Sequence, residues 1–328
     1  MIQYRSFLNT DPPHLAEIWT KCAAVRPHFQ RVTPELLDDL VFSKQYFDRD
    51  GLIVAVEDGA FAGFVHAAFG PSEDRSTISP DVGVICALLV SDNFRGRGVG
   101  RKLLELGEHY LTGRGAKKIY GGGARPFNPF YWGLYGGAEL PGVLASEPAA
   151  QQLFSAAGFE VVGHTILWRC NLENFKAPVN RQQLMVKRRF DVRAVADVQP
   201  TTWWEANTSE ALEKIRYELV EKTSREIKAT ITMWTLERKT DDVLLRSAGI
   251  MDLSVDEDLR GQGAGKYLVS DVLKELKLRN FSTVEGQTFR QNEAIAALLR
   301  SLGFDEVDQG AIFQKTVEQP DQAAAANG

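Results

Sequence analysis

Apolar positions recur at two spacings along the first half of the chain. Helical spacing covers 13–23 and 34–47, and each segment has a proline near its start. Apolar runs of strand length follow at 52–69, which predicts two strands joined by a hairpin turn at 57–59, and at 83–90. The rest of this half predicts, in order, a helix, a strand, a helix and a strand: 98–113, 117–122, 147–159 and 161–170. A short alternating segment, 2–7, opens the chain.

The second half repeats the later part of this order. Its pattern predicts two strands, then a helix, a strand, a helix and a strand: 228–238, 247–255, 263–279, 281–288, 292–304 and 306–317. In each half the last helix ends in Gly-Phe, at 158–159 and 303–304, and glycine is a natural residue just past a helix end. The polar stretch 171–183 is the best linker candidate, and 318–328 is expected to be a flexible tail.

Two glycine-rich turns lie half a chain length apart and have the same design. They read FRGRGVGRKLL at 94–104 and LRGQGAGKYLV at 259–269, and each opens onto a predicted helix. A repeat of this kind suggests two copies of one domain. The 328 residues suit two domains of about 150 residues. We expect domains at 1–175 and 184–317, joined by a linker at 176–183.

A glycine-rich turn at the start of a helix can bind an anion. It directs unpaired backbone N–H groups to one point at the positive end of the helix dipole, where a phosphate or pyrophosphate is the typical guest. Neither turn has the spacing of a Walker A or a Rossmann motif, since both read Gly-x-Gly-x-Gly. The alternative is an ordinary tight turn that starts a helix. Two copies in the same surroundings favour anion binding.

Residues 95–100 and 260–265 both fit the pattern (Gln/Arg)-x-x-Gly-x-(Gly/Ala). With the strand before it and the helix, strand and Gly-Phe helix after it, this pattern resembles the GNAT superfamily of N-acetyltransferases, in a tandem form. The resemblance implies an α/β (α+β) fold of two GNAT-type domains, each with a mixed, splayed sheet flanked by helices.

The resemblance also implies acetyl-CoA, or another acyl-CoA, as cofactor. The pyrophosphate would lie on the turn and the pantetheine along the strand before it. An asparagine near the start of the last helix contacts CoA in the family, and Asn292 matches it whereas Glu147 does not. The implied cofactor-binding residues are Leu88, Leu89, Val90, Arg95, Gly96, Arg97, Gly98, Val99, Gly100 and Arg101, and Leu253, Val255, Arg260, Gly261, Gln262, Gly263, Ala264, Gly265, Lys266 and Asn292.

The acid and base of the reaction are not evident from the sequence. Many family members place an acidic tyrosine four residues before the glycine of Gly-Phe, but Phe154 and Leu299 stand there. An insertion at 128–147 is rich in aromatic residues and glycine, which suits a loop over a pocket. Its candidates for pocket lining are Phe130, Tyr131, Trp132 and Tyr135, and its candidate acid–base groups are Tyr131, Tyr135 and Glu139. The alternative is that these side chains pack the loop onto the domain.

Three further residues are candidate bases: His66, Asp252 and Glu285. Each could equally be structural or face solvent. The pair 203–204, two tryptophans, is expected in the core, and the basic run 187–189 at a solvated edge.

Composition excludes several other classes. A net charge of −5 argues against nucleic-acid binding through bulk charge. No apolar run is long enough to span a membrane and the first residues do not resemble a signal peptide, so a cytoplasmic location is expected. The three cysteines and five histidines lack the spacing of a disulfide framework or a metal site, so no metal is expected.

The sequence therefore predicts an N-acetyltransferase in which a primary amine, on a small molecule or a peptide, attacks the thioester directly. The longer acceptor-side segments and the insertion favour the first half as the one that performs the transfer. The alternative is a catalytically degenerate acyl-CoA sensor or interaction module, which the two missing tyrosines favour. The acceptor, the acyl chain and the oligomeric state stay open.

Overall fold

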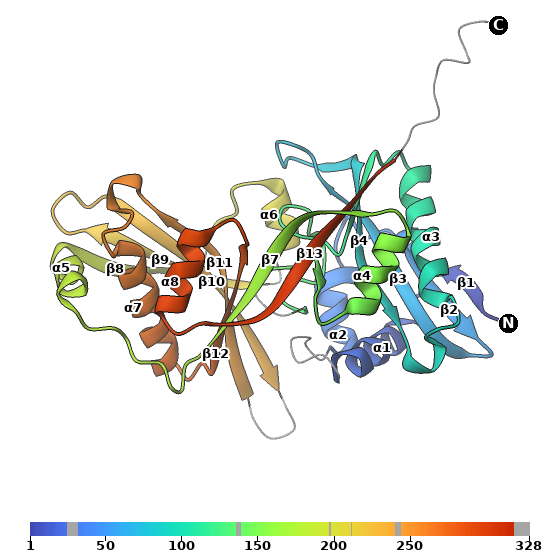
Figure 1. The fold of residues 1–328 in the computed structure, drawn as a ribbon, viewed down its shortest axis with the longest axis horizontal. Coiled ribbons are helices and arrows are strands. Elements are labelled where there is room, and N and C mark those ends of the chain that lie inside the picture. Colours follow the sequence, from blue (N-terminus) through green and yellow to red (C-terminus); the bar gives the residue numbers. More distant parts are fainter. Residues whose placement is uncertain (25–31, 136–138, 197, 211, 240–243, 318–328) are drawn as a thin grey trace, which may run out of the picture.

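The computed structural model describes residues 1–24, 32–135, 139–196, 198–210, 212–239 and 244–317. The predicted tail, 318–328, lies outside the described residues. Two lobes lie side by side, one built mainly from each half of the chain, and two long strands cross between them (Figure 1). The fold is mixed α/β with helices on both faces of the sheet, as predicted.

The first lobe follows the predicted order closely. Its elements are β1 (Gln3–Ser6), α1 (Pro12–Ala24), α2 (Pro34–Leu37), β2 (Leu52–Glu57), β3 (Ala60–Pro71), β4 (Ile78–Val90), α3 (Val99–Gly113), β5 (Lys118–Gly121), β6 (Val143–Leu144), α4 (Pro148–Ala156) and β7 (Glu160–Asn171). The helix predicted over 34–47 is shorter, because α2 passes into a π-helical turn at Asp38–Phe42.

The second lobe contains four elements that the pattern did not predict. These are α5 (Arg181–Arg189), β8 (Phe190–Ala196), α6 (Trp203–Thr208) and β9 (Glu213–Glu221). The predicted elements follow as β10 (Ile227–Lys239), β11 (Leu244–Val255), α7 (Ala264–Leu278), β12 (Thr283–Phe289), α8 (Glu293–Ser301) and β13 (Asp305–Thr316). Helix α5 begins inside the segment predicted as a linker.

One continuous sheet runs through both lobes. The described strands follow the order β1-β2-β3-β4-β5-β13-β7-β12-β11-β10-β9-β8, and β6 pairs with β13. In the first lobe β4 pairs with β5 in parallel only over residues 82–85. In the second lobe β11 pairs with β12 only over 247–249. Beyond these short ladders the strands are no longer paired, and in the second lobe a cavity lies beside the unpaired end of β11.

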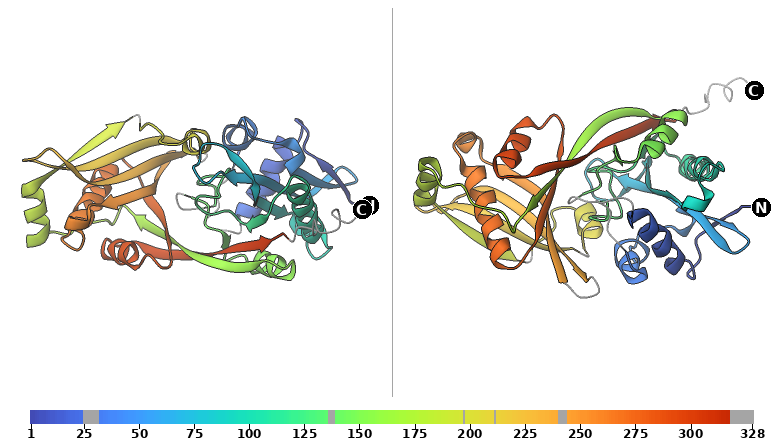
Figure 2. Two further views of the ribbon diagram at one scale, coloured as in Figure 1. Left: turned by 90° about the horizontal axis from the view of Figure 1, so that it is seen from above. Right: turned by 60° about the horizontal axis from the view of Figure 1, so that its bottom comes forward.

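The last strands of the two halves are exchanged. Strand β7 pairs with β12 of the second lobe along Thr165–Asn171, and β13 pairs with β5 of the first lobe along Phe313–Thr316. The side chains of each strand pack in the lobe whose sheet the strand joins. Trp168 of β7 packs in the second-lobe core and Phe313 of β13 in the first-lobe core. Strands β7 and β13 also pair antiparallel with each other across the middle of the molecule (Figures 1 and 2). Each lobe is therefore completed by the other half of the chain.

Three apolar clusters fill the space around the sheet. One lies under α3 and α4 in the first lobe, and one lies under α7 and α8 in the second. The third covers the opposite face of β3 and β4, where α1, α2 and the loop between β5 and β6 pack, and it includes Trp234 of β10. The two lobes therefore meet through the face of each sheet that lies away from the glycine turns.

We predict that neither half folds alone. A chain of residues 1–175 would lack β13, so the edge of β5 and the hole left by Phe313 would be exposed. We expect this fragment to aggregate or to melt without cooperativity, and to be recovered when residues 176–328 are produced with it. Circular dichroism melts and co-purification measure both outcomes. A monomeric 1–175 fragment with a cooperative melt would contradict the exchange.

Candidate functional site

Both glycine turns adopt the backbone geometry that an anion-binding turn requires. Gly98 and Gly263 are the residues just before α3 and α7, with φ of 79° and 85°, and Gly96 and Gly261 have φ of 74° and 72°. Glycine alone takes this left-handed region without a steric cost of about 1–2 kcal/mol. No side chain caps either helix, so the N–H groups of each first turn remain available.

The second turn opens into a well-formed cleft. A cavity of about 600 Å³ lies between the end of β11, the start of α7 and α8, and its walls include Leu253, Val255, Lys266, Asn292 and Leu298. A Cβ atom on Gly265 would lie 3.1 Å from Val255 Cγ2 and 3.2 Å from Leu298 Cδ1. Glycine at this position therefore lets β11, α7 and α8 approach closely around the cleft.

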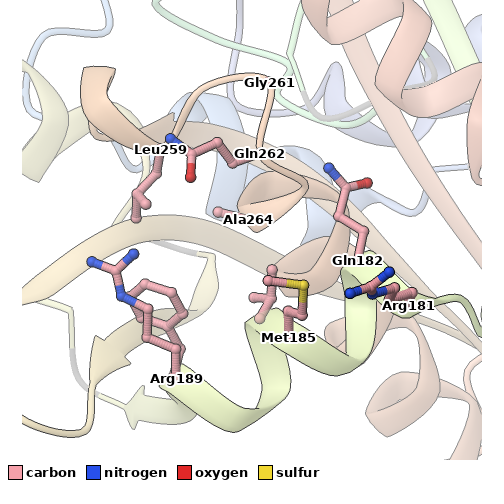
Figure 3. Close-up of a pocket in the computed structure, with 10 residues that line it drawn as sticks. Arg181, Gln182, Met185, Arg189, Leu259, Gly261, Gln262 and Ala264 are labelled. Carbon is pink, nitrogen blue, oxygen red and sulfur yellow. The ribbon is translucent and has the colours of Figure 1, made fainter.

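Helix α5 forms a second wall beside the same turn. A neighbouring cavity of about 610 Å³ separates the α5 side chains Arg181, Gln182 and Met185 from Gly261 and Gln262 (Figure 3). The Gln182 side chain lies over Gly263, where an added Cβ would be 2.8 Å from Gln182 Cδ. The segment predicted to be a linker thus contributes part of the second site. The basic run 187–189 ends α5 and is exposed, as expected.

The basic residues of the first turn are engaged with carboxylates. Arg95 lies 2.8 Å from Asp92, Arg97 lies 2.7 Å from Glu57, and Arg101 lies 3.3 Å from Glu105. These pairs are exposed and therefore contribute little stability, but they lower the local positive charge.

A separate groove lies between α3 and α4 of the first lobe. Its cavity measures about 260 Å³ and is lined by side chains of α3, α4 and β13, without β4 or the turn glycines. Lys315 of β13 bridges it, with Nζ 2.6 Å from Glu108 Oε2 and 2.9 Å from the Ala157 carbonyl oxygen. The exchanged strand thus narrows the first groove.

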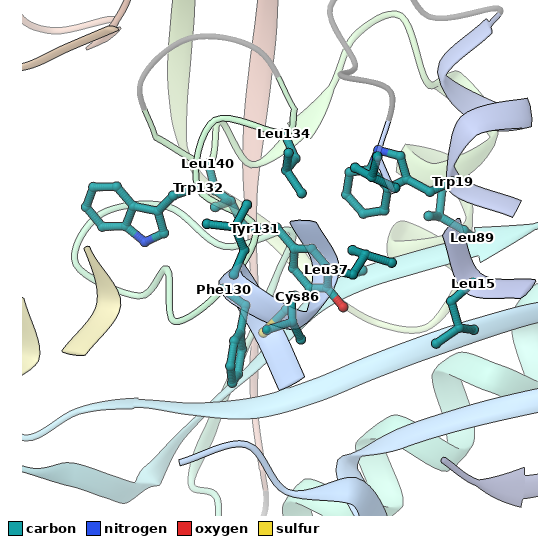
Figure 4. Close-up of a cluster of buried hydrophobic side chains, with 14 of the residues drawn as sticks. Leu15, Trp19, Leu37, Cys86, Leu89, Phe130, Tyr131, Trp132, Leu134 and Leu140 are labelled. Carbon is teal, nitrogen blue, oxygen red and sulfur yellow. The ribbon is translucent and has the colours of Figure 1, made fainter. Parts of the chain in front are cut away.

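The two lobes differ most on the face opposite the glycine turns. In the first lobe Ala87 and Leu89 of β4 are 3% and 2% exposed, beneath α1, α2 and the loop after β5 (Figure 4). The matching residues of β11 are Asp252 and Ser254, and both are exposed. The strand that would hold the pantetheine is therefore sealed by apolar packing on this face in the first lobe. In the second lobe the same face is open and polar.

The aromatic residues of the insertion account for that seal. Phe130, Tyr131 and Trp132 are all buried, and Tyr131 stacks on Trp19 of α1 with ring centroids 5.2 Å apart. Tyr131 has a φ of 64°, a costly conformation for a large side chain that tight packing can impose. The aromatic side chains of the insertion therefore pack the loop onto the first lobe, which was the alternative to a pocket lining.

Three of the predicted acid–base groups of the first lobe form hydrogen bonds inside this core. Tyr131 Oη lies 2.9 Å from His66 Nδ1, and Tyr135 Oη donates to the Cys86 carbonyl oxygen at 3.2 Å. Burial lowers the pKa of His66 to about 3 and raises the pKa of Tyr131 well above its usual value. His66 is therefore neutral and Tyr131 protonated at physiological pH.

Glu139 and Asp252, predicted separately, meet between the lobes. Arg125, in the loop after β5, donates from Nη1 to Asp252 Oδ1 at 2.8 Å and lies 3.3 Å from Glu139 Oε1. Burial raises the pKa of Glu139 to about 7, although Arg125 opposes the shift. Sequence reasoning missed Arg125, because nothing in its neighbourhood marks a contact with a strand more than a hundred residues away. The remaining candidate, Glu285, accepts a hydrogen bond from Arg169 Nε at 2.8 Å.

Other expected features are placed as follows. Trp204 is buried at the lobe interface, whereas Trp203 is 36% exposed. The three cysteines are buried and form no disulfide within the described chain. Among the described residues no group of three or more His, Cys, Asp or Glu side chains is arranged to hold a metal ion. No described helix is long and apolar enough to cross a membrane.

Comparison with known proteins identifies both repeats. The model of the acetyltransferase (GNAT) family matches residues 14–136 and again 201–304. A curated relative, the [ribosomal protein bS18]-alanine N-acetyltransferase of Escherichia coli K12, is 36% identical over 64 residues, which is 20% of this chain and 43% of that protein. The chain thus spans less than half of that relative.

Solved structures share the whole two-lobed fold. A tandem GNAT protein from the clavulanic acid biosynthesis pathway has a TM-score of 0.67 at 14% identity, covering 98% of this chain and 100% of that one. A GCN5-related N-acetyltransferase from Sphaerobacter thermophilus has a TM-score of 0.63 at 16% identity, covering 98% and 97%. A glucosamine N-acetyltransferase region of a fungal multi-domain β-N-acetylglucosaminidase has a TM-score of 0.63 at 18% identity, covering 96% of this chain and 38% of that one.

We predict that burial of His66 makes the fold sensitive to mild acid. Its pKa is depressed in the folded state, so below about pH 6.5 the unfolded chain binds a proton that the folded chain does not. Between pH 7.5 and 5.5 this difference lowers the free energy of unfolding by about 1.4 kcal/mol. Glu139 titrates in the same pH range with the opposite sign, so the test compares proteins. In urea titrations, the change in the free energy of unfolding from pH 7.5 to 5.5 should be about 1.4 kcal/mol more destabilising in the wild type and in His109→Gln, whose side chain is exposed, than in His66→Gln. Equal changes in all three proteins would contradict this account.

Proposed function

The chain belongs to the acetyltransferase (GNAT) family, and we propose that it is an acetyl-CoA-dependent N-acetyltransferase whose second half performs the transfer. The choice of half is supported by a difference in exposure between β4 and β11. Ala87 and Leu89 lie under apolar packing, whereas Asp252 and Ser254 are exposed at the same positions of the repeat. Only the second arrangement gives an amine access to the strand that would hold the thioester.

The second cleft fits acetyl-CoA on its other face. No atom lies within 4 Å of the position that a Cβ on Gly261 would take. The backbone of the turn can therefore contact a pyrophosphate directly. Lys266, in the first turn of α7, adds a positive charge at the cleft wall, and Asn292, the residue just before α8, also lines the cleft. The diverging β11 and β12 leave the backbone of Leu253–Val255 available to the pantetheine amides. Acetyl-CoA would supply the activated acyl carbon, and the chain would position it.

The first half has a structural role in this proposal. Its acceptor-side face is covered by the apolar cluster that includes Trp234 of β10, and the hydrogen bond between Tyr131 and His66 is buried there. The sequence favoured this half for transfer because of its insertion, but the insertion fills the place where an acceptor would stand. We therefore assign catalysis to the second half, although its segment before the glycine turn is the shorter of the two.

The acceptor is proposed to be a primary amine. The test is a panel of amines incubated with acetyl-CoA and the full-length protein, with thiol release as the measurement. The panel should include a peptide with an N-terminal alanine and an amino sugar, since similar proteins carry those acceptors in their names. We expect release with at least one amine. Tight CoA binding with no release across the panel would instead support the sensor hypothesis.

A matched pair of variants tests which half binds the acetyl-CoA that reacts. Lys266 and Arg101 occupy the same position after the two turns, and both side chains can be truncated without straining the backbone. Loss of one charge-assisted phosphate contact should cost about 1.5 kcal/mol, or roughly a tenfold rise in the KM for acetyl-CoA, in Lys266→Ala. Arg101→Ala should stay within about twofold of the wild type. The reverse result would place the transfer in the first half.

A further inference from the structure

Three charged side chains from both halves of the chain gather at one point of the interface. Arg125 and Glu139 come from the loop between β5 and β6, and Asp252 comes from β11. A single guanidinium nitrogen, Arg125 Nη1, lies 2.8 Å from Asp252 Oδ1 and 3.3 Å from Glu139 Oε1. Two carboxylates thus share one cation, which leaves the cluster with an excess of negative charge when both are ionised.

The cluster contacts β11, the strand whose end lines the second cleft. Arg125 Nη1 also donates to the Met251 carbonyl oxygen at 3.2 Å. Met251 lies in the irregularity of β11 opposite Thr232 and Met233, and Leu253, two residues further on, lines the cleft. The charged groups therefore approach the same stretch of β11 from the face opposite the glycine turn. That is the side from which an acceptor would have to reach an acyl group held along Leu253–Val255.

Glu139 occupies an unusual position for a carboxylate. Its residue is 7% exposed, and Oε1 forms an ion pair with Arg125 at 3.3 Å but accepts no hydrogen bond from the described residues. A buried carboxylate oxygen without a hydrogen bond is costly, and such groups in native proteins call for an explanation. Asp252, by contrast, has a side chain that is 55% exposed, and Arg125 is 37% exposed. The cluster therefore runs from an exposed carboxylate at the surface to a buried one whose Oε1 accepts no hydrogen bond.

We propose that this cluster is the acceptor site of the second half, in which Asp252 attracts the ammonium group and Glu139 takes its proton. The inference rests on the proposed function. A proton passes from the ammonium nitrogen to Glu139, and the lone pair so freed forms the C–N bond at the thioester carbonyl as the C–S bond breaks. A second proton leaves that nitrogen to solvent, and the thiolate of CoA is protonated from Glu139, which returns it to the carboxylate.

The same charges define the class of acceptor. A primary ammonium compound suits two carboxylates that share one guanidinium, whereas an acceptor with an acidic group beside the amine would be repelled by Asp252. The site also explains how a lobe without histidine could move a proton: the carboxylate is delivered by the other half.

The charged groups around Glu139 shift its pKa in opposite directions. The facing charges are Arg125, which lowers the pKa of Glu139, and Asp252, which raises it; Glu205 of α6 acts on Arg125 from the far side. Since the carboxylate is the active form, kcat/KM should rise with pH through about 7 and then level off. Arg125→Gln should move that midpoint to higher pH, and Asp252→Asn should move it to lower pH.

The experiment measures kcat/KM against pH for the best amine of the panel, with CoA affinity determined by calorimetry in parallel. Glu139→Gln should lower kcat about 100-fold and abolish the rise near pH 7, with CoA affinity unchanged. Asp252→Asn should raise the KM for the amine more than it lowers kcat. Asp81→Asn, which breaks an exposed ion pair with Lys117 in the first lobe, is the matched control and should behave as the wild type.

Three results separate the possibilities. If Glu139→Gln binds CoA normally and keeps both its rate and its pH profile, the acceptor site is wrong while the proposed function stands. If Glu139→Gln does not fold, unmoved midpoints in Arg125→Gln and Asp252→Asn overturn the proposal in the same way. If the wild type neither binds CoA nor releases thiol with any amine, the proposed function fails and this inference fails with it.

Discussion

The pairing of β7 with β13 is the constraint on which the rest of the molecule depends. Each strand begins in its own lobe and ends in the sheet of the other, so the lobes cannot shift without breaking a ladder of backbone hydrogen bonds. This connection holds the loop after β5 against β10. A Cβ on Gly133 or on Gly249 would lie 2.0 Å from the indole of Trp234, so both glycines are required by the contact. The interface is therefore built as tightly as a core.

A fixed interface lets two copies of one fold diverge in role. Both lobes have a glycine turn, and each turn starts a long helix whose apolar side packs on the core of its lobe. What differs is the opposite face of the strand before each turn. Apolar side chains at Ala87 and Leu89 bind the insertion in place, and Asp252 and Ser254 leave the equivalent surface of the second lobe accessible. A few changes of polarity on one strand thus separate a supporting lobe from a reactive one.

The sequence could predict what is local. The left-handed glycines at 98 and 263, the helices they start and the long strands of clear periodicity all follow from neighbours in the chain. The exchange of β7 and β13 could not be predicted, because an alternating strand has the same pattern whichever sheet it joins. Strand β9, EKIRYELVE, was missed because charged residues interrupt its apolar positions, among them the buried Glu218 that Arg193 and Arg216 neutralise. Tyr131 was a reasonable candidate acid by its chemistry, and only its packing against Trp19 shows where it lies.

The insertion illustrates why the two halves have to be considered together. Its aromatic residues close the first lobe, while Arg125 before it and Glu139 within it reach the second. The burial of Tyr131 and the burial of Glu139 are coupled, because both residues belong to the same packed loop. A change that loosened the aromatic core would therefore let water reach Glu139 and bring its pKa back toward the ordinary value. The first lobe would then influence proton transfer in the second without contacting acetyl-CoA, through the burial it imposes on one carboxylate.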